Sequence, residues 1–540
     1  MSRSAERTCF MIFLMFFVSA DAFSTVCPSA STQTYSSMIT ATASNDTDII
    51  FLASTSQGPV QMWMRAFGFF KEASLDPNTM QGIPLPTSVR MSPEEAESGN
   101  ILVIVSSDAA ALFIKTDHSM YQLRDISQLS KEYITVSYFA PNAAETWHST
   151  IGISAVFNDA ALDVTFKNGI DVEEIFSRFT NETKCNVTGQ SISCKSSGSR
   201  RYVMQIQSRS DLSGTKITSS KDVSVIAGAV AESNVMDHMV PLDSLAISYT
   251  VFGFPGGNGS CVCRIVAASG LTDVTVDGVN TVTINGEGDY IDVNVSGDSF
   301  HTISATYPIL VAMVIQNGES SSPAFIVAHS AGNVSQYTFT LISDDTNDNV
   351  EHYIVVPAVP QGGILLNGES PPNETLCMAV GGTMETGCFV PVEGYDAVHS
   401  ISSSDGGYFT AYLIGSGDHG TFGSALIETV TSKNWTDPPP PLSLDMSYCV
   451  KSGGLGNYAS NGTNVQMATM DVKKKRRIIS FTIKHMRMPS AEACQLTCFL
   501  YASCRGVNYN SLTLDNNCDI VFGGPSCSDY NTEWTFYKMK

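Results

Sequence analysis

Asp237-His238 and Asp418-His419 each put a carboxylate directly beside an imidazole in the sequence. Neighbouring residues of a strand point to opposite faces, so neither pair forms a ready catalytic dyad, and polar loop residues are the favoured interpretation. The sequence contains no Gly-x-Ser-x-Gly elbow, zinc helix, phosphate loop or dinucleotide fingerprint. We therefore expect no catalytic residue, no cofactor and no enzyme, with an unrecognised β-fold active site as the remaining alternative.

Two other groups of residues carry atoms that bind metals. Cys261 and Cys263 lie two apart on an expected strand and should face the same side, but no second pair lies nearby in the sequence to complete a zinc site. The run from Asp344 to Asn349 offers oxygen ligands for calcium, yet it lacks the glycine and glutamate positions of an EF-hand. A solvated acidic turn is the favoured interpretation of that run, and we expect no metal site.

One dense basic run interrupts an otherwise acidic chain of net charge -22. Three interpretations compete for it: a solvated loop or strand edge, a site for sulfated or sialylated glycans, and a processing site for a basic-residue protease. The acidic balance argues against nucleic acid as a partner, because phosphates would be repelled. The candidate ligand-binding residues are Lys473, Lys474, Lys475, Arg476 and Arg477.

The N-terminus predicts the compartment. Arg3 and Arg7 precede an apolar run from Cys9 to Val18, and a small-x-small cleavage site follows, so residues 1–22 are expected to be a secretory signal peptide. No later run is apolar for the eighteen residues of a membrane span. We expect a secreted, extracellular protein with no membrane span. Nine Asn-x-Ser/Thr sequons predict glycosylation: Asn45, Asn181, Asn186, Asn258, Asn294, Asn333, Asn373, Asn434 and Asn461.

Cysteine usage agrees with an oxidising compartment. Fourteen cysteines, less Cys9 in the signal, leave thirteen, and six of them crowd the last hundred residues. One thiol is therefore left over, either free or available for a disulfide-linked oligomer. Two pairs can each close a small loop, and three further cysteines have no evident partner. The two pairs are Cys185 with Cys194 and Cys377 with Cys388, and the three others are Cys27, Cys261 and Cys263.

Short apolar runs separated by Gly, Asn, Asp and Ser clusters predict a mainly β fold after a flexible lead-in over residues 23–45. Residues 211–228 indicate a β-hairpin, and similar hairpins begin at Ile104, Ile303 and Ile401. The spacing of about a hundred residues predicts roughly four tandem units. A unit of that size suits a β-sandwich better than a propeller blade, although a propeller-like closure stays open.

Shorter pieces repeat in the same order. Leu245-x-x-x-Tyr249-x-Val251 matches the stretch from Leu129 to Tyr133, with Tyr353 as a weaker third copy, and Asp273-Val-Thr matches Asp163-Val-Thr. A fixed order of similar strands is typical of a duplicated structural unit.

These residues also carry a family resemblance. The run Asp-Leu-Ser-Gly-Thr-x-Ile-x-Ser from Asp211, the Val-x-Val-x-x-Gly after it, Asp237-His238 and the segment from Ala267 to Gly278 resemble the N-terminal region of IgG Fc-binding protein, a family of secreted, mucus-associated proteins. The resemblance covers roughly residues 45–430 and implies a β-repeat region over residues 46–436. Asp222 stands where the family usually has a proline, and the cysteine expected before Asp237 is missing.

Four consecutive prolines mark a stiff linker over residues 437–444. Beyond it, Cys-x3-Cys-x5-Cys after a Pro-Ser helix entry resembles the PAN/apple domain over residues 445–540, a small α+β fold stapled by disulfides that generally binds proteins or carbohydrate. Another small disulfide scaffold is the alternative. The resemblance implies three disulfides: Cys449 with Cys527, Cys494 with Cys518, and Cys498 with Cys504.

Together these features predict a secreted, non-enzymatic recognition glycoprotein, active in mucosal or innate-defence adhesion to extracellular protein or glycan ligands. The alternative is a structural component of mucus or extracellular matrix that assembles through disulfides. The sequence selects no ligand.

Overall fold

The computed structural model has a mainly β fold, and among the residues it describes no helix is long and apolar enough to cross a membrane. It describes most of the chain between residues 33 and 427, and four strands beyond. The described residues are 33–37, 49–53, 59–66, 69–85, 97–98, 102–106, 110–115, 120–137, 148–155, 160–167, 170, 175, 185–195, 202–230, 234–255, 259–296, 299–317, 323–330, 334–341, 350–394, 397–417, 420–427, 465–471, 478–486, 504–509 and 518–522.

The strands up to residue 427 fall into four consecutive units. Unit 1 contains β1 (Gln33–Ser37), β2 (Ile49–Ala53), β3 (Val60–Ala66), β4 (Phe69–Leu75), β5 (Met80–Pro84), β6 (Glu97–Ser98), β7 (Leu102–Ser106), β8 (Ala111–Lys115) and β9 (Met120–Gln122). Unit 2 contains β10 (Ser130–Ile134), β11 (His148–Ala155), β12 (Ala161–Thr165), β13 (Cys185–Thr188), β14 (Ser191–Lys195), β15 (Tyr202–Ser208), β16 (Lys216–Val230) and β17 (Asn234–His238). Unit 3 contains β18 (Ala246–Phe252), β19 (Gly259–Ala267), β20 (Thr272–Val276), β21 (Asn280–Ile284), β22 (Tyr290–Ser296), β23 (Phe300–Asn317) and β24 (Ala324–Val327). Unit 4 contains β25 (Gln336–Thr340), β26 (Glu351–Val356), β27 (Ile364–Leu366), β28 (Leu376–Ala379), β29 (Thr386–Pro391), β30 (Val398–Ser403), β31 (Tyr412–Gly417) and β32 (Gly420–Ala425).

All four units share one strand topology. In unit 2 the first half of β16 pairs with β10 and β12 to form an outer sheet, and its second half pairs with β11 and β17 to form an inner sheet. In unit 3, β23 runs through both sheets in the same way. Units 1 and 4 follow the same path with the long strand divided, as β7 and β8 and as β30 and β31. The predicted fourfold repeat is therefore present.

The predicted hairpin over residues 211–228 is wrong. The polar stretch from Ser219 to Asp222 is a corner inside the continuous strand β16, where the chain passes from the outer to the inner sheet. Polar residues are accommodated at this corner because they are exposed or half-buried there. The polar break in the sequence therefore marks a bend between two layers and not a turn between two strands.

A buried tyrosine recurs at one position of three units. The Tyr133 hydroxyl accepts a hydrogen bond from the Ser130 backbone N–H and donates to the Val223 carbonyl, and the Tyr249 hydroxyl makes the same two bonds to its own unit. In unit 4 the hydroxyl of Tyr337 donates to the Phe409 carbonyl. The third copy of the motif is thus Tyr337, and the expected Tyr353 lies instead on β26.

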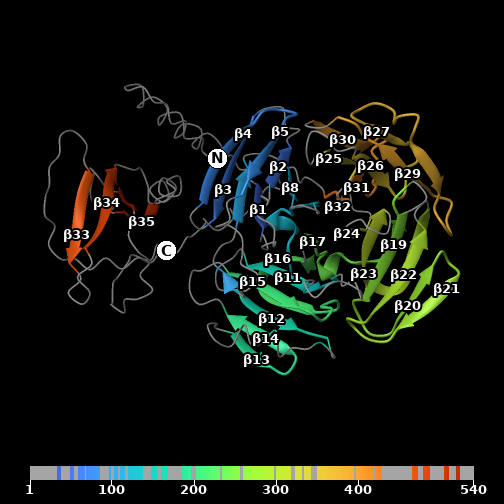
Figure 1. The fold of residues 1–540 in the computed structure, drawn as a ribbon, viewed down its shortest axis with the longest axis horizontal. Coiled ribbons are helices and arrows are strands. Elements are labelled where there is room, and N and C mark those ends of the chain that lie inside the picture. Colours follow the sequence, from blue (N-terminus) through green and yellow to red (C-terminus); the bar gives the residue numbers. More distant parts are fainter. Residues whose placement is uncertain are drawn as a thin grey trace, which may run out of the picture.

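Four hydrophobic cores close the units into a ring. The core inside each unit also takes in residues from the inner sheet of a neighbour, so that unit 1 packs on unit 2, unit 2 on unit 3, unit 3 on unit 4, and unit 4 on unit 1. Figure 1 shows the units around a common centre, from blue unit 1 through green unit 2 and lime unit 3 to orange unit 4. Each unit has two layers, as in a sandwich, formed by two sheets in units 1 and 4 and by one bent sheet in units 2 and 3, whereas the closure is propeller-like.

Burial on both faces explains the sequence of the inner strands. In β8, Leu112 and Ile114 point into the core of unit 1, and Ala111 and Phe113 point into the core of unit 4. A strand covered on both faces needs a continuous apolar run and not an alternating one. The runs over residues 223–230 and 309–315 are buried for the same reason.

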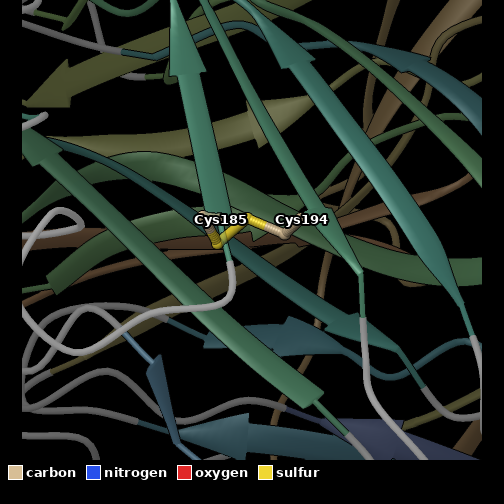
Figure 2. The surroundings of a disulfide bond; sticks show 2 residues. All are labelled: Cys185 and Cys194. Atoms are coloured by element: carbon tan, nitrogen blue, oxygen red, sulfur yellow. A yellow bond between two sulfur atoms is a disulfide. The ribbon is translucent and has the colours of Figure 1, made fainter.

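Two disulfides staple hairpins at the periphery. Cys185 of β13 is bonded to Cys194 of β14, its direct partner across the pair (Figure 2). Cys377 and Cys388 join β28 to β29 in the same way in unit 4. These are the two small loops that the sequence paired.

Beyond the ring, a separate four-stranded sheet has the order β33 (Val465–Asp471), β34 (Ile478–Met486), β36 (Cys518–Phe522) and β35 (Cys504–Tyr509). This sheet lies within residues 445–540, where the sequence resembles a PAN/apple domain. The helix, the basic run and four of the six cysteines of that prediction lie outside the described residues, so the assignment stays a prediction.

Candidate binding site on the ring axis

Four short strands, one from each unit, meet at the centre of the ring. β9 contacts β17, β17 contacts β24, β24 contacts β32, and β32 contacts β9. One backbone hydrogen bond that recurs in all four units identifies the equivalent positions near the ends of these strands. The N–H groups of Leu123, Met239, Ala328 and Leu426 each donate to the inner-sheet strand of their own unit. The residues that follow them, Arg124, Val240, His329 and Ile427, are therefore counterparts around the axis.

Two of these counterparts are polar and touch across the axis. Arg124 belongs to unit 1 and His329 to unit 3, which lie opposite one another in the ring, and the Nη2 of Arg124 lies 3.0 Å from the Nε2 of His329. The matching positions in units 2 and 4 are the apolar Val240 and Ile427. The ring therefore carries one guanidinium and one imidazole at its centre, flanked by apolar side chains.

A second layer of polar residues lies beside this pair. The carboxylate of Asp237 accepts hydrogen bonds from the backbone N–H of His238 at 2.7 Å and of Val327 at 2.8 Å, which ties unit 2 to unit 3. The His238 ring instead stands edge-on to the ring of Tyr121, with centroids 5.6 Å apart. The expectation that this Asp-His pair is not a dyad agrees with these contacts, but the pair lies on a buried strand and not in a polar loop.

The ring is closed between units 1 and 4 by one amide side chain. Gln122 donates from Nε2 to the Ile427 carbonyl at 3.0 Å and accepts from the Ile427 N–H at 2.7 Å. Its own backbone N–H donates to the Ser424 hydroxyl. Units 3 and 4 are joined by Tyr412, whose hydroxyl accepts from the N–H of His329 and donates to its carbonyl.

Burial sets the charges of the axial cluster. Desolvation raises the pKa of Asp237 to about 7, although two backbone N–H donors and the nearby Arg124 favour its ionised form. Desolvation lowers the pKa of His238 to about 3 and the pKa of His329 well below its ordinary value, and the positive charge of Arg124 acts in the same direction. Both imidazoles are therefore neutral at neutral pH, which lets His329 accept a hydrogen bond from Arg124.

The cluster holds polar atoms that its own contacts do not satisfy. The Nε of Arg124 and both ring nitrogens of His238 are buried without a hydrogen-bond partner. Such groups are uncommon in protein interiors and mark candidate functional positions. Arg124 is buried, whereas His329 beside it is half-buried. A guanidinium in that setting is suited to a carboxylate or another anionic oxygen group.

Sequence reasoning found Asp237 and His238 but missed Arg124 and His329. The available signal was the repeat itself, because aligning the four inner strands would have placed one cation and one imidazole at the same position of units 1 and 3. Asp418, His419, the acidic run from Asp344 to Asn349 and the basic run from Lys473 to Arg477 lie outside the described residues.

The cysteine pair of β19 belongs to the core. Cys261 and Cys263 are both buried, face the same side as expected, and have sulfur atoms 3.6 Å apart. Burial raises the pKa of the Cys261 thiol. Within the described part of the chain no group of three or more His, Cys, Asp or Glu side chains is placed to hold a metal ion.

The described sequons are exposed. Asn186 on β13, Asn294 on β22 and Asn373 before β28 all lie at the surface. The remaining predicted glycosylation positions, Asn45, Asn181, Asn258, Asn333, Asn434 and Asn461, lie outside the described residues.

Comparison with known proteins identifies a family. The family model of IgGFc binding protein matches residues 119–415, from the start of the axial strand of unit 1 into β31 of unit 4. No curated protein and no solved structure matches the chain. The matched segment covers more than half of the 540 residues and includes most of the axial cluster. The chain therefore belongs to the IgGFc-binding protein family.

Proposed function

We propose that this protein is an extracellular recognition glycoprotein whose four-unit ring binds a protein or glycan ligand at its axis. The observation that carries the proposal is the cross-axis pair of Arg124 and His329, whose position is repeated in all four units but polar only in units 1 and 3. Membership of a family described as IgGFc binding protein supports binding as the role.

The chemistry of the axis favours a ligand with an accessible carboxylate. Arg124 offers a fixed fork of N–H donors, of which Nε has no partner within the protein. Sialylated glycans and acidic protein loops both carry such groups. Antibody Fc, a glycoprotein, is the ligand that the family description names, and it is the first to test.

Secretion and glycosylation complete the proposal. The signal-like N-terminus supports residues 1–22 as a cleaved leader, and the exposure of Asn186, Asn294 and Asn373 supports their modification. We further propose the linker at residues 437–444 and a PAN/apple domain at residues 445–540, with the basic run from Lys473 to Arg477 as a second, salt-sensitive glycan contact.

Disulfide-linked assembly into mucus or matrix is the second candidate function. Cys261 and Cys263 are buried in the core of unit 3, so neither is accessible to another chain. Assembly would have to use Cys27 or the C-terminal cysteines. Migration of the secreted protein on non-reducing and reducing gels tests this role directly, since a chain that runs as a monomer on both excludes it.

The binding experiment uses the full secreted chain. Immobilised Fc, sialylated mucin and desialylated mucin are presented at low and high salt to the wild-type protein, to Arg124→Gln and to a variant with residues 473–477 changed to Gln. Lys221→Gln is the matched control, because it removes one positive charge from an exposed corner of β16.

We expect Arg124→Gln to weaken binding about tenfold or more, in line with the loss of a charged hydrogen-bond donor. Lys221→Gln should bind like the wild type. Binding that survives Arg124→Gln but is abolished by salt or by the 473–477 variant would move recognition to the C-terminal region and refute the axial site.

A further inference from the structure

A second polar cluster lies on the surface of unit 3, away from the axis. The Nδ1 of His301 lies 2.6 Å from the Oδ2 of Asp277, and its Nε2 lies 2.8 Å from the Oγ of Ser299. All three side chains are half-buried. From this geometry we propose that Ser299, His301 and Asp277 form a charge-relay site with a nucleophilic serine that cleaves carboxylic esters.

The contacts orient each member of the relay. Asp277 can only accept from His301, so the proton resides on Nδ1 and the lone pair of Nε2 faces Ser299. The other oxygen of Asp277 accepts from the Thr302 backbone N–H at 2.9 Å, which fixes the carboxylate. The Ser299 Oγ also lies 2.5 Å from the Ser296 Oγ, which can donate to it, and 3.3 Å from the Ser296 carbonyl, and it reaches the Nε2 of His301 at 2.8 Å.

Unit 4 holds a closely related arrangement in which each reactive feature is replaced. Asn367 stands at the place of Asp277 in the same kind of left-handed turn, and its Oδ1 accepts from the Ser400 N–H. Its Nδ2 lies 3.1 Å from the Nδ1 of His399, which is buried, and the Nε2 of that histidine lies 2.9 Å from the carbonyl of Gly394. An asparagine is therefore sufficient where this contact only has to hold the turn in place.

Unit 3 differs from unit 4 in three respects that matter to catalysis. A carboxylate replaces the amide, a hydroxyl replaces the carbonyl beside Nε2, and the histidine reaches solvent, with 21% of the His301 side chain exposed. With these changes the buried hydrogen-bonded contact of unit 4 becomes, in unit 3, a serine nucleophile, a histidine base and a carboxylate that orients the histidine. This combination is what distinguishes the cluster from an ordinary turn contact.

The surroundings indicate the substrate class. A turn of unit 4 closes over the carboxylate, because a side chain at Gly381 would collide with the Asp277 Oδ1. Val279, two residues after Asp277, and Met384, three residues after Gly381, are exposed apolar residues. Exposed apolar residues near the relay suit esters of short acyl groups, which need less transition-state stabilisation than amides.

The reaction follows from the contacts. Ser299 Oγ attacks the ester carbonyl while its proton passes to the Nε2 of His301, forming a tetrahedral intermediate. The carbon–oxygen bond to the alcohol then breaks, and the proton moves from His301 to the departing oxygen. Water attacks the acyl-serine, gives a proton to His301, and releases the carboxylic acid as that proton returns to Ser299. No redox partner is required.

The test uses the full secreted chain with p-nitrophenyl acetate as the probe. Release of p-nitrophenolate is followed by absorbance, and the acetylated residue is located by mass spectrometry of the acid-quenched protein. Variants are Ser299→Ala and Asp277→Asn, which keeps the turn because unit 4 has Asn there. Asp273→Asn is the control, since this carboxylate lies on the same hairpin and accepts from the Thr283 hydroxyl.

We expect an acetyl group on Ser299, loss of that adduct in Ser299→Ala, and a fall in rate of about a hundredfold or more in Asp277→Asn. Asp273→Asn should keep the wild-type rate. Turnover at the buffer rate, acetylation at a different residue, or equal rates for Asp277→Asn and Asp273→Asn would each overturn the proposal. Circular dichroism of the variants separates these results from misfolding.

Discussion

Asp237 and His238 are adjacent and buried, yet they should affect stability in opposite directions as the pH changes. The pKa of Asp237 is about 7 in the folded chain and near its ordinary value when unfolded, so the folded state retains a proton that the unfolded state has lost. Its contribution to stability is present at low pH and is lost as the pH rises toward 7. The pKa of His238 is about 3, so the unfolded state binds the extra proton, and stability is lost as the pH falls below its ordinary value.

The magnitude follows from proton linkage. Between about pH 4.5 and about pH 6.5 each residue changes the free energy of unfolding by about 1.4 kcal/mol per pH unit, with opposite signs. The two contributions therefore cancel in the wild type. Relative to the wild type, Asp237→Asn should make stability rise more steeply with pH, by about 3 kcal/mol over this interval, and His238→Gln should make it rise less steeply by the same amount.

The assay is urea unfolding at several pH values, followed by tryptophan fluorescence. We compare the slopes of the free energy of unfolding against pH and not its absolute values, because each substitution also has a cost that does not depend on pH. In Asp237→Asn that cost includes an amide N–H of the new side chain that faces a backbone N–H, such as that of Val327. Titrating groups outside the axial cluster contribute equally to all three proteins. Slopes that are unchanged in Asp237→Asn, or that shift in the same direction in both variants, would refute the assigned protonation states.

Three further predictions concern a close glycine contact, a buried arginine and a disulfide. Gly214→Ala should destabilise the chain by several kcal/mol, because Gly214 has a φ of 83° and a Cβ there would overlap the Gly288 carbonyl oxygen, whereas Gly278→Ala, also at positive φ but in open space, should cost about 1 kcal/mol; thermal unfolding distinguishes the two. Arg264→Ala should cost about 3 kcal/mol by removing the cation that the Asp211 and Asp292 carboxylates share, against less than about 1 kcal/mol for the exposed Lys216→Ala, measured by urea unfolding. Replacing both Cys185 and Cys194 by Ser should lower stability by about 2–3 kcal/mol and abolish the reductant dependence of that hairpin, read out by thermal unfolding with and without dithiothreitol.

The sequence predicted the repeat but not its closure. Strand composition and recurring Leu-x-x-x-Tyr pieces reveal local order, because turns and tyrosine hydrogen bonds act within one unit. The corner in β16 resembles a hairpin in the sequence, since polar residues break a pattern in the same way at a bend and at a turn. Whether Ala111 and Phe113 face solvent or another unit depends on a contact with residues more than two hundred positions away.

The two polar clusters illustrate the same limit. Arg124 and His329 are 205 residues apart, and Asp277 and His301 are 24 apart, so no short motif joins them. Asp237 and His238 form a short motif because they are adjacent in sequence, but neighbouring side chains of a strand point to opposite faces of the sheet. Aligning the repeat unit by unit places Arg124 and His329 at corresponding positions, and it places Asp277 and His301 at the positions of Asn367 and His399.

Ring closure also has a consequence for biosynthesis. The bond between Gln122 and Ser424 joins residues 302 positions apart, and translation at about 5–20 residues per second takes about 15–60 s to cover that distance. During this interval unit 4, whose apolar residues later cover Ala111 and Phe113 of β8, has not yet been made. The first unit therefore keeps an uncovered apolar strand, the kind of surface that chaperones recognise, until the fourth has been made. A nascent chain that stops before β32 carries an uncovered apolar strand, and cellular quality control retains proteins that expose such a surface.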